Sequence, residues 1–161
     1  MGKIKMEKEI NCDGQTPLEN SSGLQVEVQT RDQLNALEFE NINKAITKYL
    51  ISRPTDKKAP FSYSWFLQVH KEMLGNVWSW AGQIRTSNKT IGMDKTQVRE
   101  ALKTLEGDFQ YWISSNMDPH ELATHLHHRL VWIHPFENGN GRWARLITNI
   151  YLKQKNLPQV F

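Results

Sequence analysis

Twelve residues at positions 134–145 limit the folds open to this chain more than any other segment. They read His-Pro-Phe-Glu-Asn-Gly-Asn-Gly-Arg-Trp-Ala-Arg, directly after an apolar run, and the residues from Arg142 onward are typical of a starting helix. Gly139 and Gly141 allow left-handed backbone angles and a close approach of the backbone to a ligand. Such a turn presents free N–H groups and the positive end of a helix dipole at one point. The segment therefore predicts an anion site at the start of a helix.

The basic side chains of this segment make phosphate the expected anion. Arg142 and Arg145 stand three residues apart, so both can reach toward the same side of the helix start. Guanidinium groups beside a nest of backbone amides are typical of phosphate binding. His134, on the other side of the turn, is the group that can move a proton, because an imidazole titrates near neutrality. Taken alone, His134 would more often be a core histidine that caps a turn, but the loop that follows it favours the chemical role.

The segment resembles the signature of Fic (filamentation-induced-by-cAMP) domains, which reads HPF-x-[D/E]-GNG-R-x-x-R. A pattern of this length is far more specific than a lone glycine-rich loop. Asn138 departs from it, because most active members of the family have an acid at this position. Residues 16–19, 37–42 and 77–86 also resemble the Fic subgroup called mobile mystery protein B, so that the likeness covers roughly residues 16–161. The residues that match the signature are His134, Pro135, Phe136, Gly139, Asn140, Gly141, Arg142 and Arg145.

The resemblance implies both a fold and a reaction. The fold would be mainly α, a Fic-type helical bundle with one short β-hairpin flap. The reaction would be the transfer of AMP from ATP, with Mg²⁺ bridging the phosphates, to a Ser, Thr or Tyr hydroxyl of a target protein. His134 would be the general base, a role worth ~10²–10⁴ in rate. The implied phosphate ligands are Gly139, Asn140 and Gly141 in an anion hole, Arg142 at the departing phosphate charge and Arg145 at the terminal phosphate.

Asn138 leaves three functions open. Its amide oxygen can ligate Mg²⁺, but without charge, so the affinity for the metal should fall. The chain would then be an adenylyltransferase with a weak metal site, which is the interpretation we prefer. It would alternatively be a phosphotransferase like the Doc branch of the superfamily, which has Asn here but lacks this Gly-Asn-Gly-Arg run. The third alternative is a nucleotide-binding interaction module without turnover.

Apolar residues outside the signature recur at helical spacing in several segments. Thr30 and Gln33 form a capping box for the first helix, and Asp118 followed by Pro119 marks the start of the fourth. Residues 82–94 are instead short, alternating and turn-rich, and they give the only predicted β element, a hairpin. Helices are expected at about 30–50, 62–74, 96–112, 118–133 and 140–155.

The domain organisation predicted from this pattern is simple. Residues 1–15 are polar and are expected to be a flexible leader, and residues 16–161 are expected to be one Fic domain. Within that domain we expect an arm at 16–29, a candidate regulatory helix at 30–50 and a core at 62–161. The chain stops a few residues after the last helix, so a further C-terminal helix of the kind found in relatives is left open.

The helix at 30–50 offers acids for self-inhibition. Many Fic proteins are restrained by a helix whose Glu pairs with the second arginine of the signature and misplaces the terminal phosphate, usually within [S/T]-x-x-x-E-[G/N]. Glu38 and Glu40 fit this pattern only in part, because Leu34 and Ala36 stand four residues before them. The hypothesis is that Glu38 or Glu40 approaches Arg145. The alternative for each is a solvated acid on the helix surface.

Composition bears on partners and location. With 20 Lys and Arg against 17 Asp and Glu, the net charge is +3, and no basic run is present, which favours a solvated surface over a nucleic-acid site. A DNA-linked regulator would rest on this mild basicity alone. No apolar run approaches the length of a membrane span, and the single cysteine, Cys12, has no internal partner. We therefore expect a cytoplasmic protein whose partners are a target protein and an antitoxin-like or regulatory protein.

Two other patterns have plainer explanations. His120 and His125 stand five apart, ~140° around a helix, whereas the zinc motif H-E-x-x-H needs ~40°. Helix-packing and surface histidines are therefore preferred over a zinc site. The six tryptophans have apolar neighbours at helical spacing, which predicts core positions rather than stacking on nucleic-acid bases.

Overall fold

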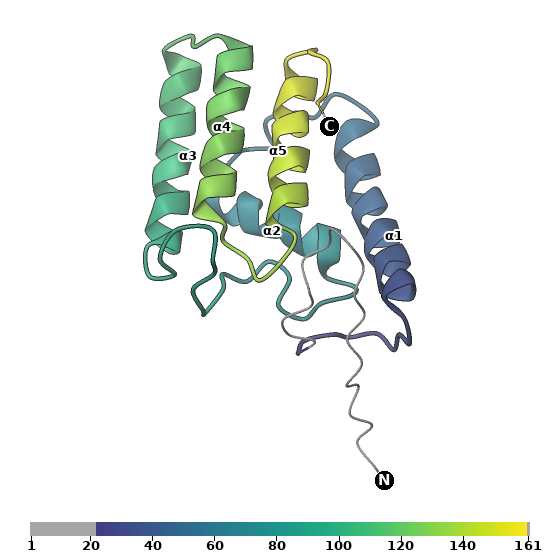
Figure 1. The fold of residues 1–161 in the computed structure, drawn as a ribbon. Coiled ribbons are helices and arrows are strands. Elements are labelled where there is room, and N and C mark those ends of the chain that lie inside the picture. The colour runs from purple at the N-terminus through teal and green to yellow at the C-terminus, as the bar shows by residue number, and fades with distance from the viewer. Residues whose placement is uncertain (1–21, 161) are drawn as a thin grey trace.

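The computed structural model of the chain describes residues 22–160, which form five α-helices (Figure 1). The predicted leader at 1–15, Cys12 and the segment 16–19 lie outside the described residues. The prediction of a mainly α fold is confirmed. The helices are α1 (Arg31–Leu50), α2 (Tyr63–Leu74), α3 (Val98–Ser114), α4 (Pro119–Ile133) and α5 (Asn140–Gln154).

Side-chain caps explain where three of the helices begin. The Thr30 hydroxyl accepts from the Gln33 N–H, and the Gln33 side-chain oxygen accepts from the Thr30 N–H. These two bonds complete the expected capping box of α1. Ser62 caps α2, and Asp118 caps α4 in front of Pro119. The third helix begins at Val98 rather than at Thr96, because the backbone and hydroxyl of Thr96 both bond to the Asp94 carboxylate.

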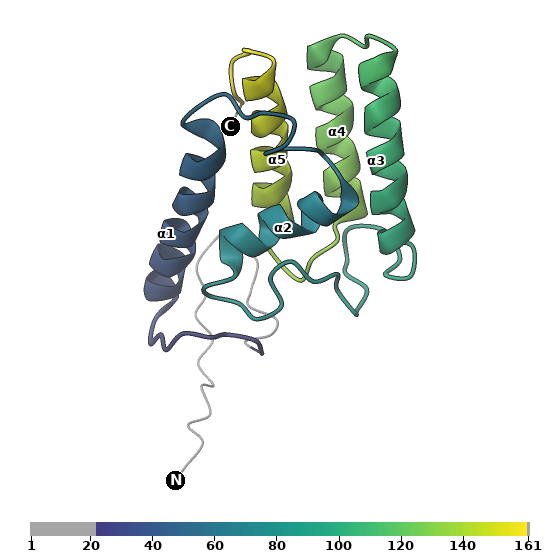
Figure 2. The ribbon, with the colours of Figure 1, turned by 180° about the vertical axis from the view of Figure 1, so that it is seen from behind.

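The helices pack so that α5 touches most of the others. Figure 1 shows α3, α4 and α5 side by side, with α1 beyond α5, and Figure 2 shows α2 crossing this row from the other side. Helix α5 packs against α4, α1 and α2. The signature segment lies at the junction of α4 and α5, which pack against each other.

Aromatic side chains fill much of the core. Phe61 stacks on Phe109 with ring centroids 4.4 Å apart, and Tyr151 meets both rings edge-on. Trp143 is fully buried and donates its indole N–H to the Phe66 carbonyl at 2.9 Å. The prediction of core tryptophans is wrong for Trp132 near the end of α4, whose residue surface is 58% exposed, because its position faces away from α5 and the core.

The predicted hairpin at 82–94 is not formed. Within residues 22–160 there is no strand, and the β structure is one isolated antiparallel bridge between Leu24 and Trp78. The reason lies in the hydrogen bonds of the loop. The carbonyls of Ser87 and Met93 accept from the Arg85 guanidinium, so the loop folds around this side chain instead of pairing its two sides as strands.

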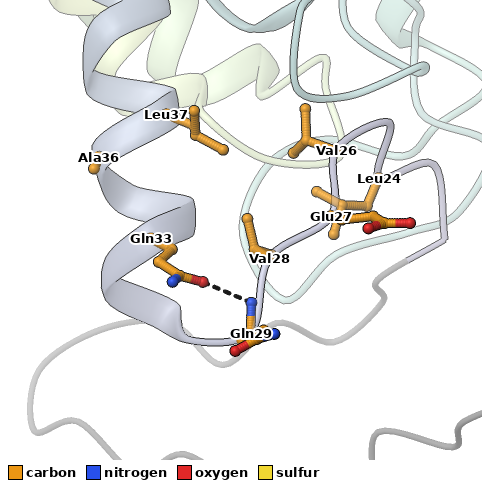
Figure 3. Close-up of a pocket in the computed structure, with 8 residues that line it drawn as sticks. All are labelled: Leu24, Val26, Glu27, Val28, Gln29, Gln33, Ala36 and Leu37. Atoms are coloured by element: carbon orange, nitrogen blue, oxygen red, sulfur yellow. Dashed lines mark hydrogen bonds between the residues drawn. The ribbon is translucent and has the colours of Figure 1, made fainter.

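A groove of about 1080 Å³ separates the arm at 22–29 from the first half of α1 (Figure 3). Leu24, Val26 and Val28 line one side, and Ala36 and Leu37 line the other. None of the eight residues drawn in Figure 3 belongs to the signature segment, so this groove is separate from the predicted phosphate site. Among residues 22–160, no helix combines the length and the apolar character needed to cross a lipid bilayer.

Candidate functional site

The signature segment forms a tight connection between α4 and α5 with two left-handed residues. His134 (φ 51°, ψ 61°) ends α4, and its N–H bonds to the Leu130 carbonyl at 3.2 Å. Gly139 (φ 78°) precedes the first residue of α5. Between them, the Asn140 side chain holds both backbone groups of Phe136: its Oδ1 accepts at 2.9 Å and its Nδ2 donates at 2.8 Å. The loop is therefore braced by one of its own side chains.

That brace changes what Asn140 can offer a ligand. Its side chain is buried and both of its polar atoms bond to the Phe136 backbone, so its backbone N–H is the group that we expect in the anion hole. The first intrahelical bond of α5 runs from the Trp143 N–H to the Gly139 carbonyl at 2.9 Å. The N–H groups of Asn140, Gly141 and Arg142 therefore have no intrahelical acceptor, as at the start of any helix.

The two glycines of the loop do different work. A Cβ at Gly139 would lie 2.7 Å from Leu74 Cδ1, and the positive φ there already requires glycine. A Cβ at Gly141 would meet no atom within 4 Å. Gly139 therefore serves the turn and its packing on α2, whereas Gly141 keeps open space next to the free amides, which is the arrangement that admits an anion.

The surroundings of His134 favour its neutral form. Burial lowers the pKa of its imidazole below the usual value of 6.5, and the nearby positive charge of Arg85 lowers it further. The Val131 backbone acts in the opposite direction and raises the pKa, and the positive charge of Lys89 lowers it. The ring is therefore neutral at pH 7, the form that can accept a proton.

A second histidine, which the sequence did not single out, supports the loop from α2. His70 is fully buried, and its ring stacks on Phe136 with centroids 3.6 Å apart. Its Nδ1 accepts from the Gly82 N–H at 2.9 Å, which leaves Nε2 to donate to the Asn138 carbonyl, also at 2.9 Å. Burial lowers the pKa of His70 to about 3, so the ring stays neutral and keeps this pair of bonds.

Helix α1 reaches the signature through Glu38. One carboxylate oxygen accepts from the Trp78 indole N–H at 2.7 Å, and the other pairs with Arg142 at 2.7 Å. The expected approach of an acid to Arg145 is therefore corrected: the arginine that Glu38 contacts is Arg142, and Arg145 is exposed on α5. Glu40 points to the surface and pairs with Lys44 at 3.1 Å, which is the solvated role considered for it.

The loop after α2 closes over the other side of the signature. Arg85 is only 4% exposed, and its side chain donates to the His134 carbonyl at 2.6 Å. Lys89 forms a salt bridge with Glu137 inside the signature segment. Neither contact was predicted. An arginine near a predicted turn gives no sign, in one sequence, that it will be buried against the loop 49 residues later.

The side chains present make only a weak metal site. The Asn138 amide oxygen is neutral and already accepts from the Gly139 N–H at 2.6 Å. Among residues 22–160, no group of three or more His, Cys, Asp or Glu side chains is placed to hold a metal ion. At position 138 the chain would therefore offer a Mg²⁺ ion a neutral amide oxygen in place of a carboxylate.

Comparison with known proteins gives the chain a family. The model of the Fic/DOC family matches residues 60–152, more than half of the sequence. The chain belongs to the Fic/DOC family. The matched range contains the whole of α2 to α4 and the signature loop. It does not contain α1, which contributes Glu38.

Relatives within the Fic/DOC family include enzymes. The chain is 36% identical over 103 residues to protein adenylyltransferase fic-1 of Caenorhabditis elegans, an alignment that covers 58% of this chain and 20% of the relative. It thus spans about a fifth of the length of that relative. The solved structure of Fic-1 residues 134–508 from C. elegans has a TM-score of 0.68 at 28% identity, over 84% of this chain and 42% of that one.

A bacterial protein of known structure has a similar fold. BepC of Bartonella tribocorum, solved with bound AMPPNP, matches with a TM-score of 0.61 at 18% identity, over 78% of this chain and 70% of BepC. The identity is low, so this match speaks for the shared Fic fold and the arrangement of the helices alone.

Proposed function

We propose that this chain is a protein adenylyltransferase, which transfers AMP from ATP to a Ser, Thr or Tyr hydroxyl of a target protein. The observation that carries the proposal is the placement, in one braced loop, of a neutral His134 and the open amide groups around Gly141. The naming of the C. elegans relative as a protein adenylyltransferase supports it.

The proposed reaction uses four groups of the chain. His134 takes the proton from the target hydroxyl as its oxygen attacks the α-phosphorus, and the bond from that phosphorus to the bridging oxygen breaks to release pyrophosphate. The amides of the α5 N-terminus, including that of Gly141, hold the phosphate oxygens, where their dipoles favour the growing charge. Arg142 then stabilises the charge of the leaving group, and Arg145, exposed on the next turn, binds the terminal phosphate.

The proposed co-substrate is ATP together with Mg²⁺. Asn138 is the residue that would contact the ion, with a neutral oxygen whose position is set by its bond to Gly139. The Mg²⁺ dependence of the activity is accordingly expected to lie at higher metal concentrations than for a carboxylate at this position.

Helix α1 is proposed to restrain this activity. The Glu38 carboxylate occupies Arg142 and is itself held by Trp78, so Arg142 must leave this pair before it can hold a phosphate. This proposal is motivated by the ion pair between Glu38 and Arg142, which joins α1 to the signature segment. Only 9% of the Glu38 side chain is exposed, so the carboxylate is largely shielded from water.

The surroundings of the site suggest where a target binds. We propose that the loop at 84–93, which lies against His134 and carries the exposed Ile91, positions the target segment next to the histidine. The likeness of residues 37–42 and 77–86 to mobile mystery protein B supports membership of that subgroup as a further proposal. A cytoplasmic location, expected from the single cysteine and the sequence without a membrane-length apolar run, and an antitoxin-like or regulatory partner are proposed as well. The division into an arm, a regulatory helix and a core belongs with them.

A labelling experiment tests the transfer. The protein is incubated in cell lysate with Mg²⁺ and ATP labelled either at the α-phosphate or at the γ-phosphate, beside a His134→Ala control. Transfer of the α-label that disappears in the control is the expected result. Absence of label from both forms of ATP, for the wild type and for the Glu38→Gln variant, would contradict the proposal.

Phosphoryl transfer is the second candidate function. It is favoured by Asn138, because the Doc branch of the superfamily, which transfers phosphate, also has Asn at this position. Transfer of the γ-label alone would establish that reaction. Nucleotide binding without transfer of either label would instead identify an interaction module.

A further inference from the structure

The unexplained group nearest to the proposed base is Arg85. It follows a turn after α2 and is buried, yet among residues 22–160 no carboxylate is hydrogen-bonded to its guanidinium. The guanidinium instead donates to three backbone carbonyls, those of His134 at 2.6 Å, Ser87 at 2.9 Å and Met93. Its own backbone N–H donates to the Pro135 carbonyl at 2.9 Å. Burying a cation among neutral acceptors is costly, so this arrangement calls for an explanation.

We propose that Arg85 is a positioning residue for the transfer reaction, which holds the backbone of His134 and the loop at 86–93 in one fixed arrangement. The inference rests on the proposed function, since it assigns a role next to the proposed base. A planar guanidinium carries several donors in a fixed fork, and through this fork Arg85 binds carbonyls from three separate points of the chain.

The loop that Arg85 holds touches the histidine directly. A Cβ at Gly92 would lie 2.5 Å from His134 Cβ and 3.3 Å from an Arg85 nitrogen, so the Gly92 backbone is packed against both side chains. His134 is thus confined on two sides. Its carbonyl is bound by Arg85, and its Cβ is covered by the loop that Arg85 also binds. A base that must meet a hydroxyl within hydrogen-bond reach depends on such confinement.

The charge of Arg85 has a separate effect on His134. It lowers the pKa of the imidazole, in addition to burial, and Lys89 of the same loop acts in the same direction. The acids in this region are Glu137, which pairs with Lys89, and Asp94, which lies near Arg85. Removal of the Arg85 charge should therefore raise the pKa of His134 and protonate the base at a higher pH.

Two substitutions separate position from charge. Arg85→Lys keeps the cation but loses the fork, and Arg85→Gln loses both. For Arg85→Lys we expect kcat to fall about 10- to 100-fold, which is the loss typical of a misplaced catalytic group. KM for ATP should stay within about twofold of the wild-type value, because Arg85 makes no bond to the phosphate-binding amides. For Arg85→Gln we expect the same loss of kcat, and an acid limb of the pH–rate profile that moves to higher pH.

A direct reading of His134 completes the test. Its imidazole C–H signal, assigned with His134→Gln, is titrated by NMR in the wild type and in both variants, with Arg53→Gln as a control that removes an exposed arginine. The titration should move to higher pH in Arg85→Gln and stay near the wild-type position in Arg85→Lys and Arg53→Gln. Thermal unfolding shows which variants fold.

Each result decides the matter. Wild-type kcat in a folded Arg85→Lys would overturn the positioning role, as would a KM for ATP that rises as steeply as kcat falls. If Arg85→Gln does not fold, Gly92→Ala replaces it, because its Cβ must displace His134 and should lower kcat at constant charge; normal kcat would count against the inference. If the wild type transfers no AMP, the proposed function fails, and the NMR signal of His134 then tests the inference by itself: an unchanged signal position and an unchanged titration in both Arg85 variants would refute it.

Discussion

Asn138 is the residue at which this chain departs from the Fic signature, and its surroundings make the departure testable. Its carbonyl is fixed by His70 and its side-chain oxygen by the Gly139 N–H, so the loop geometry at this position does not depend on the amide nitrogen. An Asp side chain has the same shape and keeps the acceptor. The difference between the two residues is therefore mainly the negative charge offered to Mg²⁺.

We predict that Asn138→Asp lowers the Mg²⁺ concentration needed for half-maximal AMP transfer by roughly tenfold, the equivalent of about 1.4 kcal/mol of binding. The measurement is the rate of α-label transfer as a function of Mg²⁺ at fixed ATP. Asn156→Asp, an exposed position after α5, is the matched control and should leave the curve in place. An unchanged curve for Asn138→Asp would show that this position does not contact the metal.

At the scale of single residues, the sequence pointed to the residues of the signature segment. It did not point to the residues from other parts of the chain that hold this segment in place. Phe136, one of the residues that match the signature, is fully buried, as its apolar character favours. His70, Arg85 and the Trp78–Glu38 bond were missed, because each acts on residues at least 40 positions away and no local pattern marks such a contact. The partner of Glu38 was assigned to the wrong arginine for the same reason.

Helix α1 is the element through which regulation would act. Its buried face contains Leu34, Ala45 and Tyr49, as apolar spacing predicts, but also the polar residues Glu38 and Asn41. Asn41 bonds to the Glu72 carbonyl and the Asn76 N–H, which attaches α1 to the end of α2. This attachment places Glu38 next to Arg142, so the helix and the acid form one structural unit.

We predict that Glu38→Gln raises the rate of AMP transfer and lowers KM for ATP, each by roughly tenfold, the size of a coupling of about 1.4 kcal/mol. Gln can still accept from the Trp78 indole but no longer attracts Arg142. Glu40→Gln removes a neighbouring acid on the exposed side of α1 and should change neither value. Steady-state kinetics of both variants give the answer, and equal values for wild type and Glu38→Gln would eliminate restraint by α1.

Elements were predicted better than their connections. Helix starts at Thr30, Ser62 and Asp118 rest on local capping chemistry, which a single sequence contains. The loop at 82–94 was predicted as a hairpin because alternation and turn residues are also local signals. Its real shape depends on Arg85 and its distant acceptor at His134, so tertiary hydrogen bonds replaced the ladder that the pattern favours.

At the scale of the whole molecule, the buried His70 makes the free energy of unfolding depend on pH. Its folded-state pKa of about 3 lies below the value of 6.5 expected in an unfolded chain. The unfolded state therefore binds a proton first as the pH falls. The stabilisation is complete above the unfolded pKa and is lost progressively as the pH drops from there toward the folded value.

We predict that His70 accounts for about 2 kcal/mol of the loss in unfolding free energy between pH 7 and pH 5. Urea unfolding at the two pH values measures it. His70→Gln should be less stable than the wild type at pH 7, because glutamine cannot reproduce both ring bonds and the stacking on Phe136. Its unfolding free energy should nevertheless fall by about 2 kcal/mol less than that of the wild type between pH 7 and pH 5. His120→Gln, at an exposed position, should keep the wild-type difference, and an equal difference in His70→Gln would contradict the assignment.

The fold of the whole domain was predictable because the signature and the helical pattern agree. The family match over residues 60–152 and the five helices bear out the mainly α domain. What a single sequence did not contain is how α1 and the loop after α2 close around the signature, since packing between distant segments decides both.

The contact between Glu38 and Arg142 also orders events in time. The two residues are 104 positions apart, with the acid first. A ribosome makes a chain from its N-terminus, so α1 and its acid are complete before the signature leaves the exit tunnel. Under the proposed restraint, each newly made molecule would contain the inhibitory Glu38 before its signature segment is synthesised. At no stage of synthesis would a chain have the complete site without Glu38.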